Sequence, residues 1–148
     1  MKIIIFLLAG LSVSLLSHSQ TLTGDWEGKY CFGNHLNSKT AYPLSLNFAL
    51  KTDNTYFITS FSETGLYLDG SAEISICSVS YRIVQPDSIY LEETVVLRSA
   101  IPTQTGFQKM ALKMHTRKKR IELSGNWWTS DGKEKGSGKI YFWKKRED

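Results

Sequence analysis

The feature that most constrains the fold of this chain is a two-residue period in its apolar side chains. Residues 41–50, with the sequence AYPLSLNFAL, show the period most clearly, because every second residue from Leu44 to Leu50 is leucine or phenylalanine. Successive side chains of a β-strand point to opposite faces, so this period buries one face and leaves the other exposed. No window of helical period lies between the strands. The chain is therefore predicted to be all-β.

The strands that this period marks favour a closed barrel. Turn signals rich in Gly, Pro, Asn and Asp separate them, and nearly every connection is short, which favours a meander over a two-sheet sandwich. Closure also removes the exposed edges of the sheet. The sequence predicts a single antiparallel up-and-down β-barrel of about eight strands. They are expected near residues 22–31, 42–50, 54–61, 70–84, 88–98, 106–116, 120–129 and 137–145.

The first residues have the three-part pattern of a secretory signal peptide. Lys2 precedes an apolar run over residues 3–16, and small residues follow just before Gln20. An uncleaved membrane anchor is the alternative, but the run is shorter than the ~20 residues that span a bilayer. We expect residues 1–19 to be cleaved and residues 20–148 to form one exported domain, periplasmic or secreted, without a transmembrane span.

Two cysteines, Cys31 and Cys77, are present in the whole chain. In an oxidising compartment such a pair is more often bridged than free, so a Cys31–Cys77 disulfide is expected, with two free thiols as the alternative. The bridge would contribute on the order of 4 kcal/mol in the chain-entropy model. No metal site is expected, because Cys31 and His35 have no second pair of ligands at zinc spacing.

The positive charge of the chain is concentrated near its C-terminus. Residues 109–148 hold 12 basic and 5 acidic side chains, and the densest point is the run RKKR. In an exported protein such a run favours an anionic surface or glycan over nucleic acid, while the alternative is a solvated hairpin turn. The residues concerned are Arg117, Lys118, Lys119 and Arg120.

Two similar segments, LTGDWEGKY at residues 22–30 and LSGNWWTSD at residues 123–131, each combine Gly with Trp. Alternation places Trp26 and Tyr30 on the inward face of the first strand and Trp127 on the inward face of a later one. A glycine two residues before Trp26 is expected to make room at the crowded end of the barrel. The pair is thus a prediction about packing.

The run Gly24-Asp25-Trp26 resembles the opening of lipocalin-superfamily barrels. That resemblance implies a closed antiparallel barrel, commonly of eight strands, which holds a small apolar ligand. The family's late arginine, which packs over the Trp, is not fixed by a pattern here; only Lys144, Lys145 or Arg146 could take its place. The family's Thr-Asp-Tyr motif is absent between the later strands.

A polar group on an inward face would indicate a pocket. Glu93 falls on the apolar face of its strand, together with Val95 and Leu97, and the turn at Pro86 would place Ser80 opposite Glu93 and Arg82 diagonal to it. The group would then orient a polar ligand head or form a buried structural pair. The alternative is a β-bulge at Glu92–Glu93 that turns Glu93 to water.

The alternation places Trp128 and Trp143 on the outer face, where exposed aromatic rings are unusual. Together with Tyr141 they indicate either a contact surface or rings covered by a loop or by basic side-chain stems.

Two functions follow, and neither is catalytic. In the first, the barrel binds a small, mostly apolar ligand in its interior. In the second, a packed barrel acts through an outer aromatic and basic face, formed by residues 117–120, Trp128 and Trp143, as a protein-, glycan- or surface-interaction module. The ligand-binding residues would be Trp26, Tyr30, Arg82, Glu93 and Trp127.

No enzyme activity and no cofactor are expected. Glu92 and Glu93 are adjacent in one strand and so point to opposite faces, where they cannot flank one bond. No serine lies in a nucleophile elbow, and no glycine-rich phosphate loop precedes a helix.

Overall fold

The computed structural model describes residues 22–34, 36, 41–66, 72–99, 107–129 and 136–145. The expected signal peptide, residues 1–19, lies outside the described residues, and its cleavage stays a prediction. Among the described residues, no helix is both long and apolar enough to pass through a membrane.

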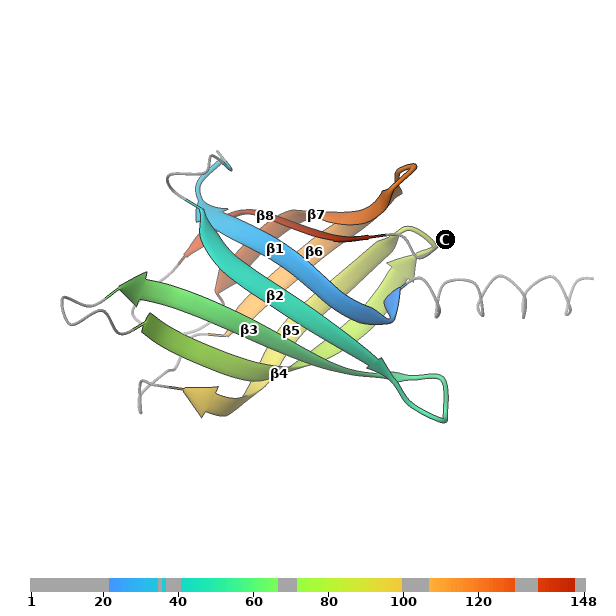
Figure 1. Cartoon of the computed structure of the whole chain (residues 1–148), viewed down its shortest axis with the longest axis horizontal. Coiled ribbons are helices and arrows are strands. Elements are labelled where there is room, and N and C mark those ends of the chain that lie inside the picture. The colour runs from blue at the N-terminus through green and yellow to red at the C-terminus, as the bar shows by residue number, and fades with distance from the viewer. Residues whose placement is uncertain are drawn as a thin grey trace, which may run out of the picture.

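Eight antiparallel strands form one closed barrel, in which each strand pairs with its neighbours in sequence and β8 returns to β1 (Figure 1). This arrangement confirms the predicted fold class, an all-β up-and-down barrel. The strands are β1 (Gly24–Phe32), β2 (Tyr42–Leu50), β3 (Tyr56–Leu66), β4 (Ala72–Gln85), β5 (Ser88–Ser99), β6 (Gln108–Thr116), β7 (Arg120–Thr129) and β8 (Ser137–Lys145).

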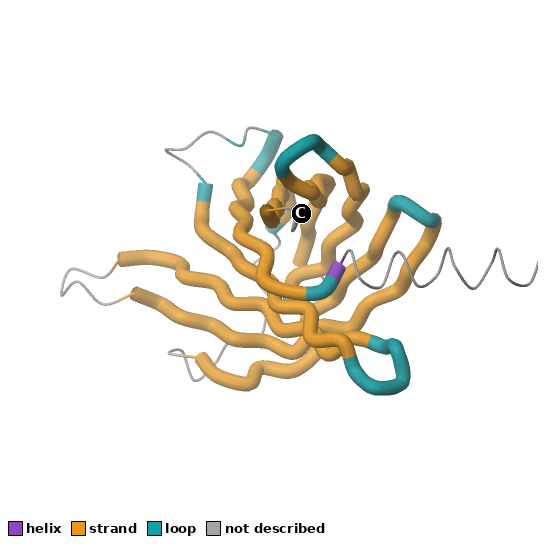
Figure 2. The backbone as a smooth tube through the Cα atoms, turned by 45° about the vertical axis from the view of Figure 1, so that its right-hand side comes forward, coloured by secondary structure: helices purple, strands orange, loops and turns teal. Residues whose placement is uncertain are grey.

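The two ends of the barrel differ in their connections. Short turns join β2 to β3, β4 to β5 and β6 to β7 at one end, which we call the hairpin end. The chain enters β1 at this end through the helical residue Leu22 (Figure 2). Strands β1, β3, β5 and β7 end at the opposite end, which we call the loop end and which lies at the left of Figure 1.

The interior of the barrel is filled largely by bulky side chains. Trp26 is fully buried and Trp127 is 2% exposed, as the alternation predicted, whereas Trp128 is half-buried on the outer face. Interiors packed in this way are the main source of stability in a domain of this size. The largest fully buried side chains are Trp26, Phe48, Phe142, Leu46, Ile58, Leu91, Met110, Leu123 and Ile140.

The glycines of β1 serve two different purposes. Gly24 has a φ of +108°, and a Cβ added there would contact nothing within 4 Å. The expectation that Gly24 makes room for Trp26 is therefore wrong, and glycine is needed at this position for its backbone conformation. Gly28 is the position that lacks space, because a Cβ there would collide with the ring of Phe142 across the β1–β8 seam.

An irregularity next to the β4–β5 turn reverses the predicted faces of β4. Gln85 pairs with Ser88, but Ile83 pairs with Ile89, so Val84 is an extra residue. A shift of one residue moves every later side chain of a strand to the opposite face.

This shift corrects the predicted neighbours of Glu93. Glu93 lies opposite Val79 and not opposite Ser80. Arg82 is exposed on the outer face, where its guanidinium carbon lies 5.4 Å from the centroid of the Tyr90 ring. The predicted Glu93–Arg82–Ser80 group is therefore not formed.

Two further irregularities change the outer half of β5. Glu93 and Val95 pair with consecutive residues of β4, so Thr94 is extra, and Leu97 is extra in the same way. Val95 and Leu97, predicted inward, are 54% and 52% exposed. The bulge considered at Glu92–Glu93 thus occurs one position later, and it leaves Glu93 inside the barrel.

Candidate ligand site at the loop end of the barrel

Glu93 places a carboxylate inside the barrel, where it is only 5% exposed. Its Oε1 accepts a hydrogen bond from the Ser60 hydroxyl at 2.6 Å, and its Oε2 accepts one from the backbone N–H of Gln108 at 2.9 Å. Burial raises the pKa of Glu93, and these two hydrogen bonds oppose that shift without cancelling it. A buried acid is thus held next to two fixed donors.

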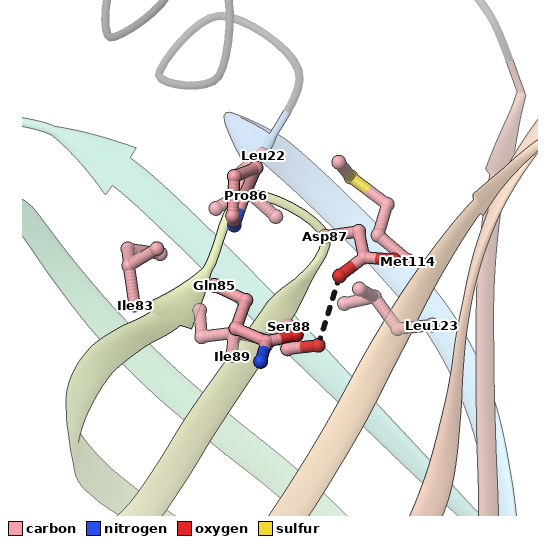
Figure 3. A pocket seen from close by; sticks show the side chains of 9 residues that line it. All are labelled: Leu22, Ile83, Gln85, Pro86, Asp87, Ser88, Ile89, Met114 and Leu123. Carbon is pink, nitrogen blue, oxygen red and sulfur yellow. Dashed lines mark hydrogen bonds between the residues drawn. The ribbon is translucent and has the colours of Figure 1, made fainter.

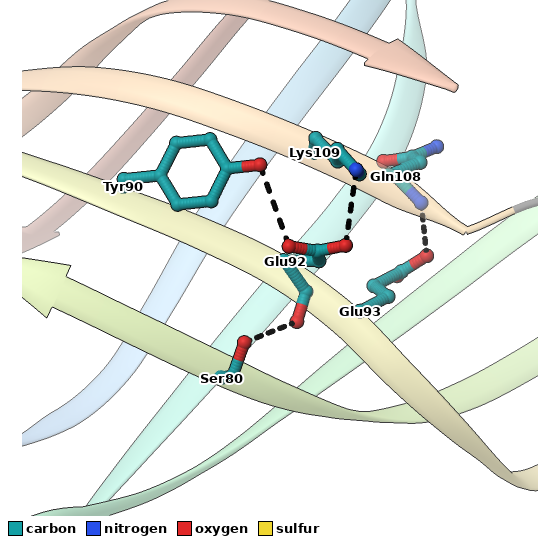
Figure 4. Close-up of polar contacts among 6 residues, drawn as sticks. All are labelled: Ser80, Tyr90, Glu92, Glu93, Gln108 and Lys109. Atoms are coloured by element: carbon teal, nitrogen blue, oxygen red, sulfur yellow. Dashed lines mark hydrogen bonds and ion pairs between the residues drawn. The ribbon is translucent and has the colours of Figure 1, made fainter. Parts of the chain in front are cut away.

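The carboxylate of Glu93 also ends the pairing of β5 with β6. The ladder runs to Glu92 and Lys109, and the next pair would join Glu93 to Gln108. The N–H of Gln108 bonds to the Glu93 side chain instead (Figure 4). Glu92 points the other way and makes an ion pair of 3.2 Å with Lys109.

Gln108 contributes a second polar atom to this end of the barrel. Its side-chain Oε1 is buried and has no hydrogen-bond partner within the described part of the chain. A buried acceptor left without a donor costs about 1–3 kcal/mol, so such atoms are rare in native structures. Unlike Glu93, this atom retains its full capacity to accept a hydrogen bond.

Cys77 lies beside the same group, opposite Ser60 in the β3–β4 ladder. Its Sγ is 3.6 Å from the hydroxyl of Ser75. Burial, and then the nearby charge of Glu93, raise the pKa of the Cys77 thiol. The thiol is therefore a poor nucleophile in this position.

The expected disulfide is not formed, because Cys31 and Cys77 are both free thiols. Cys31 lies on β1 and Cys77 on β4, and two strands separate these in the barrel. The two side chains also differ in direction, because Cys77 alternates with the buried Val79 whereas Cys31 follows the inward-facing Tyr30. Cysteines on non-adjacent strands with diverging Cβ vectors cannot be bridged without backbone movement.

Aromatic rings line one half of the loop end. We call Tyr30, Phe32, Tyr42 and Trp127 the aromatic rim. The rings of Tyr30 and Trp127 meet edge to face with their centroids 5.1 Å apart, and Phe32 and Tyr42 extend the cluster outward. The indole N–H of Trp127 donates to the carbonyl of Cys31 at 2.9 Å, which fixes the ring across β7 and β1.

Small polar side chains line the other half of this end, on β3, β4 and β5. We call Ser60, Ser62, Ser75 and Ser99 the serine wall. Ser75 on β4 pairs in the ladder with Ser62 on β3 and with Ser99 on β5, and Ser60 is next to them on β3. The loop end therefore joins a flat apolar surface to small hydrogen-bonding groups around Glu93.

Sequence reasoning identified only part of this group. Phe32 and Tyr42 could have been found by extending the alternation of Trp26 and of Leu44 by a few residues. Ser60 and Gln108 gave no signal, because a polar residue on an inward face is identified only once the register is known.

Trp26, predicted with Tyr30 and Trp127 to bind a ligand, lies apart from these two residues. It lies toward the hairpin end, where its indole N–H donates to the carbonyl of Leu22 at 2.9 Å. Lys144 Nζ lies 5.3 Å from the centroid of its ring and donates to the carbonyl of Thr23 at 2.6 Å.

A small cavity at the hairpin end lies under the β4–β5 turn, between Leu22 and Met114 (Figure 3). Its volume is about 10 Å³, room for about one water molecule. This end is closed by packing and offers no space for a ligand.

The basic run is partly neutralised by a single acid. Glu122 accepts hydrogen bonds from Arg120 at 2.6 Å and from Arg117 at 3.4 Å, while Lys118 and Lys119 are exposed. Partial desolvation opposes the ionisation of Glu122, but bonds from Tyr141 and the two arginines outweigh it and hold its pKa below the usual range.

Trp128 and Trp143 do not form one patch. The ring of Trp128 lies 6.0 Å from that of Tyr90, toward the loop end, and Trp143 stacks on Tyr141 at 5.4 Å, beside the basic run. The structure thus brings only Trp143 together with residues 117–120.

Comparison of the chain with protein-family models, with curated proteins and with solved structures gave no match in any of the three. Among the described residues, no three His, Cys, Asp or Glu side chains are placed to hold a metal ion.

Proposed function

We propose that this barrel binds a small, mostly apolar molecule that carries a hydrogen-bond donor, at the loop end, and that it acts without catalysing a reaction. The observation that carries the proposal is the buried, unpartnered Oε1 of Gln108 next to the buried carboxyl of Glu93. The amide oxygen of Gln108 accepts hydrogen bonds, so the complementary ligand group is an N–H or O–H donor.

The walls around these acceptors define the rest of the ligand. The aromatic rim offers ring faces and edges, which favour a flat apolar body. The serine wall is made of small side chains, which leave more room than the bulky residues of the interior. A ring system that carries an amine, amide or hydroxyl group meets both requirements.

The depth of the site is limited by the packed core. Trp26, Phe48 and Phe142 fill the barrel below Tyr30, so the ligand lies near the loop end and does not reach the hairpin end. Small barrels often have interiors filled in this way.

Two features support a lipocalin-like interpretation of the barrel. Gly24-Asp25-Trp26 opens β1, and Lys144 packs over the Trp26 ring where lipocalins have a late cation. We include export in the proposal, because the first 19 residues have a signal-peptide pattern.

The test uses N-phenyl-1-naphthylamine, an apolar dye with one N–H donor between two ring systems. We expect its fluorescence to rise on binding to the wild type, and the substitution Gln108→Met to weaken binding roughly tenfold, because an acceptor is lost at nearly constant volume. Glu63→Gln, an exposed acid on the outer face of β3, is the control and should change nothing.

Native mass spectrometry of the protein purified from its own source complements this titration. A bound molecule that is present in the wild type and lost in Gln108→Met would support the proposal. Equal dye binding by both proteins, or no binding, would refute it.

A further inference from the structure

A groove of about 270 Å³ lies on the outer surface of the barrel, on strands β8, β1, β2 and β3. Trp143 forms one wall and Phe61 the other, while Glu27 and Ser45 lie between them. Neither the ligand site at the loop end nor the basic run includes this groove.

The register of the sheet explains why the groove exists. Glu27 pairs with Trp143 on one side and with Ser45 on the other, and Ser45 pairs with Phe61. Trp143 and Phe61 are thus three strand spacings apart, about 14 Å between backbones. The small side chain of Ser45 leaves the space between the two rings open.

Trp143 has a glutamate on each side, and the two glutamates differ in their partners. Glu122, on β7, is bound by Arg117 and Arg120. Glu27, on β1, is exposed and makes no ion pair with any described residue. One side of the indole is therefore already an arginine–carboxylate site, and the other has the carboxylate alone.

We infer that this groove receives an arginine side chain from a partner protein. A guanidinium group binds a carboxylate through two parallel hydrogen bonds and packs against aromatic rings. Glu27 offers the carboxylate, and Trp143, whose ring is stacked on Tyr141, forms the wall of the groove beside it. Lysine makes neither the planar stack nor the forked hydrogen bond. The groove between Trp143 and Phe61 is large enough for the whole side chain.

The surface beside the groove indicates a protein partner rather than a free small cation. Phe61 is 40% exposed and pairs with the half-buried Ile76 on β4, which extends the apolar surface beyond the groove. Contiguous exposed apolar side chains beside a polar rim are typical of protein–protein contacts. An arginine on an apolar segment of the partner would match both parts of the surface.

The inference is tested with the folded protein and N-acetylarginine N-methylamide, followed by amide chemical shifts. We expect saturable shifts centred on Gly28, Ser45 and the Trp143 indole, with a dissociation constant on the order of 1 mM for so small a probe. The citrulline analogue has the same shape without the charge, and it should bind roughly tenfold more weakly.

Two variants locate the probe, and each has a matched control. Glu27→Gln and Trp143→Leu should each weaken binding about tenfold, by loss of the charge-assisted hydrogen bond and of the aromatic wall. Glu63→Gln, an exposed acid on the outer face of β3, and Trp128→Leu, the other outward tryptophan, should leave binding unchanged. Amide spectra of each variant show whether the barrel is intact.

Several results would overturn the inference. Equal binding of the citrulline analogue means that the groove does not recognise a cation, and binding of methyl glucoside in preference to either probe means that it is a sugar site. A dimer in sedimentation velocity that Glu27→Gln abolishes makes the occupant a second copy of this chain. Unchanged spectra at 20-fold excess over the expected constant, about 20 mM, would also overturn it.

Discussion

The two ends of the barrel use the same alternation of side chains for different purposes. At the hairpin end, Leu22 and Trp26 close the interior, and the polar atoms of Trp26 and Lys144 are bonded to backbone carbonyls. At the loop end, the interior holds a buried carboxyl and an amide oxygen that has no partner among the described residues. One end is built for stability, and the other keeps polar groups that reduce it.

This difference shows where a closed barrel can accommodate function. A polar group inside a packed interior lowers stability unless its hydrogen bonds are all made. Proteins retain such groups where binding completes them. The unsatisfied acceptor of Gln108 is at the end of the barrel where the β5–β6 ladder stops.

The largest effect is expected for removal of a ring from the hairpin end. Trp26→Ala should lower the free energy of unfolding by about 3–5 kcal/mol, because it leaves a cavity in a fully buried cluster. Urea unfolding measures this change. Trp128→Ala, on the outer face, should cost much less, and equal losses would contradict the distinction between inner and outer tryptophans.

A change in pH should affect the loop end selectively. The pKa of Glu93 is raised in the folded protein above its ordinary value of 4.5, so the folded state retains a proton that the unfolded chain releases. Wild-type stability should therefore fall as the pH rises from 4.5 through the folded pKa, by at most about 1.4 kcal/mol per pH unit.

The Glu93→Gln variant removes the titratable carboxyl group. Its free energy of unfolding should therefore depend less on pH over that range. Urea midpoints measured from pH 4 to pH 8 give the comparison, with Glu63→Gln as the exposed control. Parallel profiles for wild type and Glu93→Gln would show that Glu93 ionises without penalty.

A smaller effect is expected for the cation over Trp26. Lys144→Met keeps most of the side-chain length but removes the contact with the ring and the bond to the Thr23 carbonyl. The free energy of unfolding should fall by about 1 kcal/mol at this half-buried site, and thermal unfolding measures the change. Lys145→Met, at an exposed position, is the control, and an equal loss there would remove any special role for Lys144.

The smallest effect is expected for reductant. Both Cys31 and Cys77 should react with a thiol reagent in the denatured protein, and dithiothreitol should leave the unfolding curve unchanged. A bridge would instead contribute on the order of 4 kcal/mol, so a large shift with reductant would show that the two cysteines are paired.

Much of the fold could be predicted because the alternation in this chain is strong. Leu44, Leu46 and Phe48 are buried on β2, and Trp127 faces inward while Trp128 faces outward, as their positions in the sequence indicate. Short connections then leave few topologies other than a meander.

The candidate site could be predicted only in part, because the register of its strands is shifted by residues that carry no recognisable sequence signal. Val84 and Thr94 are ordinary strand residues, yet each inserts one position into the β4–β5 ladder. The first moved Arg82 to the outer face, and the second turned Val95 outward. Glu93 was placed inward correctly, but its partners Ser60 and Gln108 lie on other strands, and the sequence does not give the register that brings them to it.

The most direct measurement is a high-resolution crystal structure of the protein purified from its own source under native conditions. We predict a bound molecule at the loop end that donates a hydrogen bond to Gln108 Oε1 and lies against the rings of Tyr30 and Trp127. A single water molecule on Gln108 Oε1, or a side chain of the same chain bonded to it, would contradict the proposed ligand site.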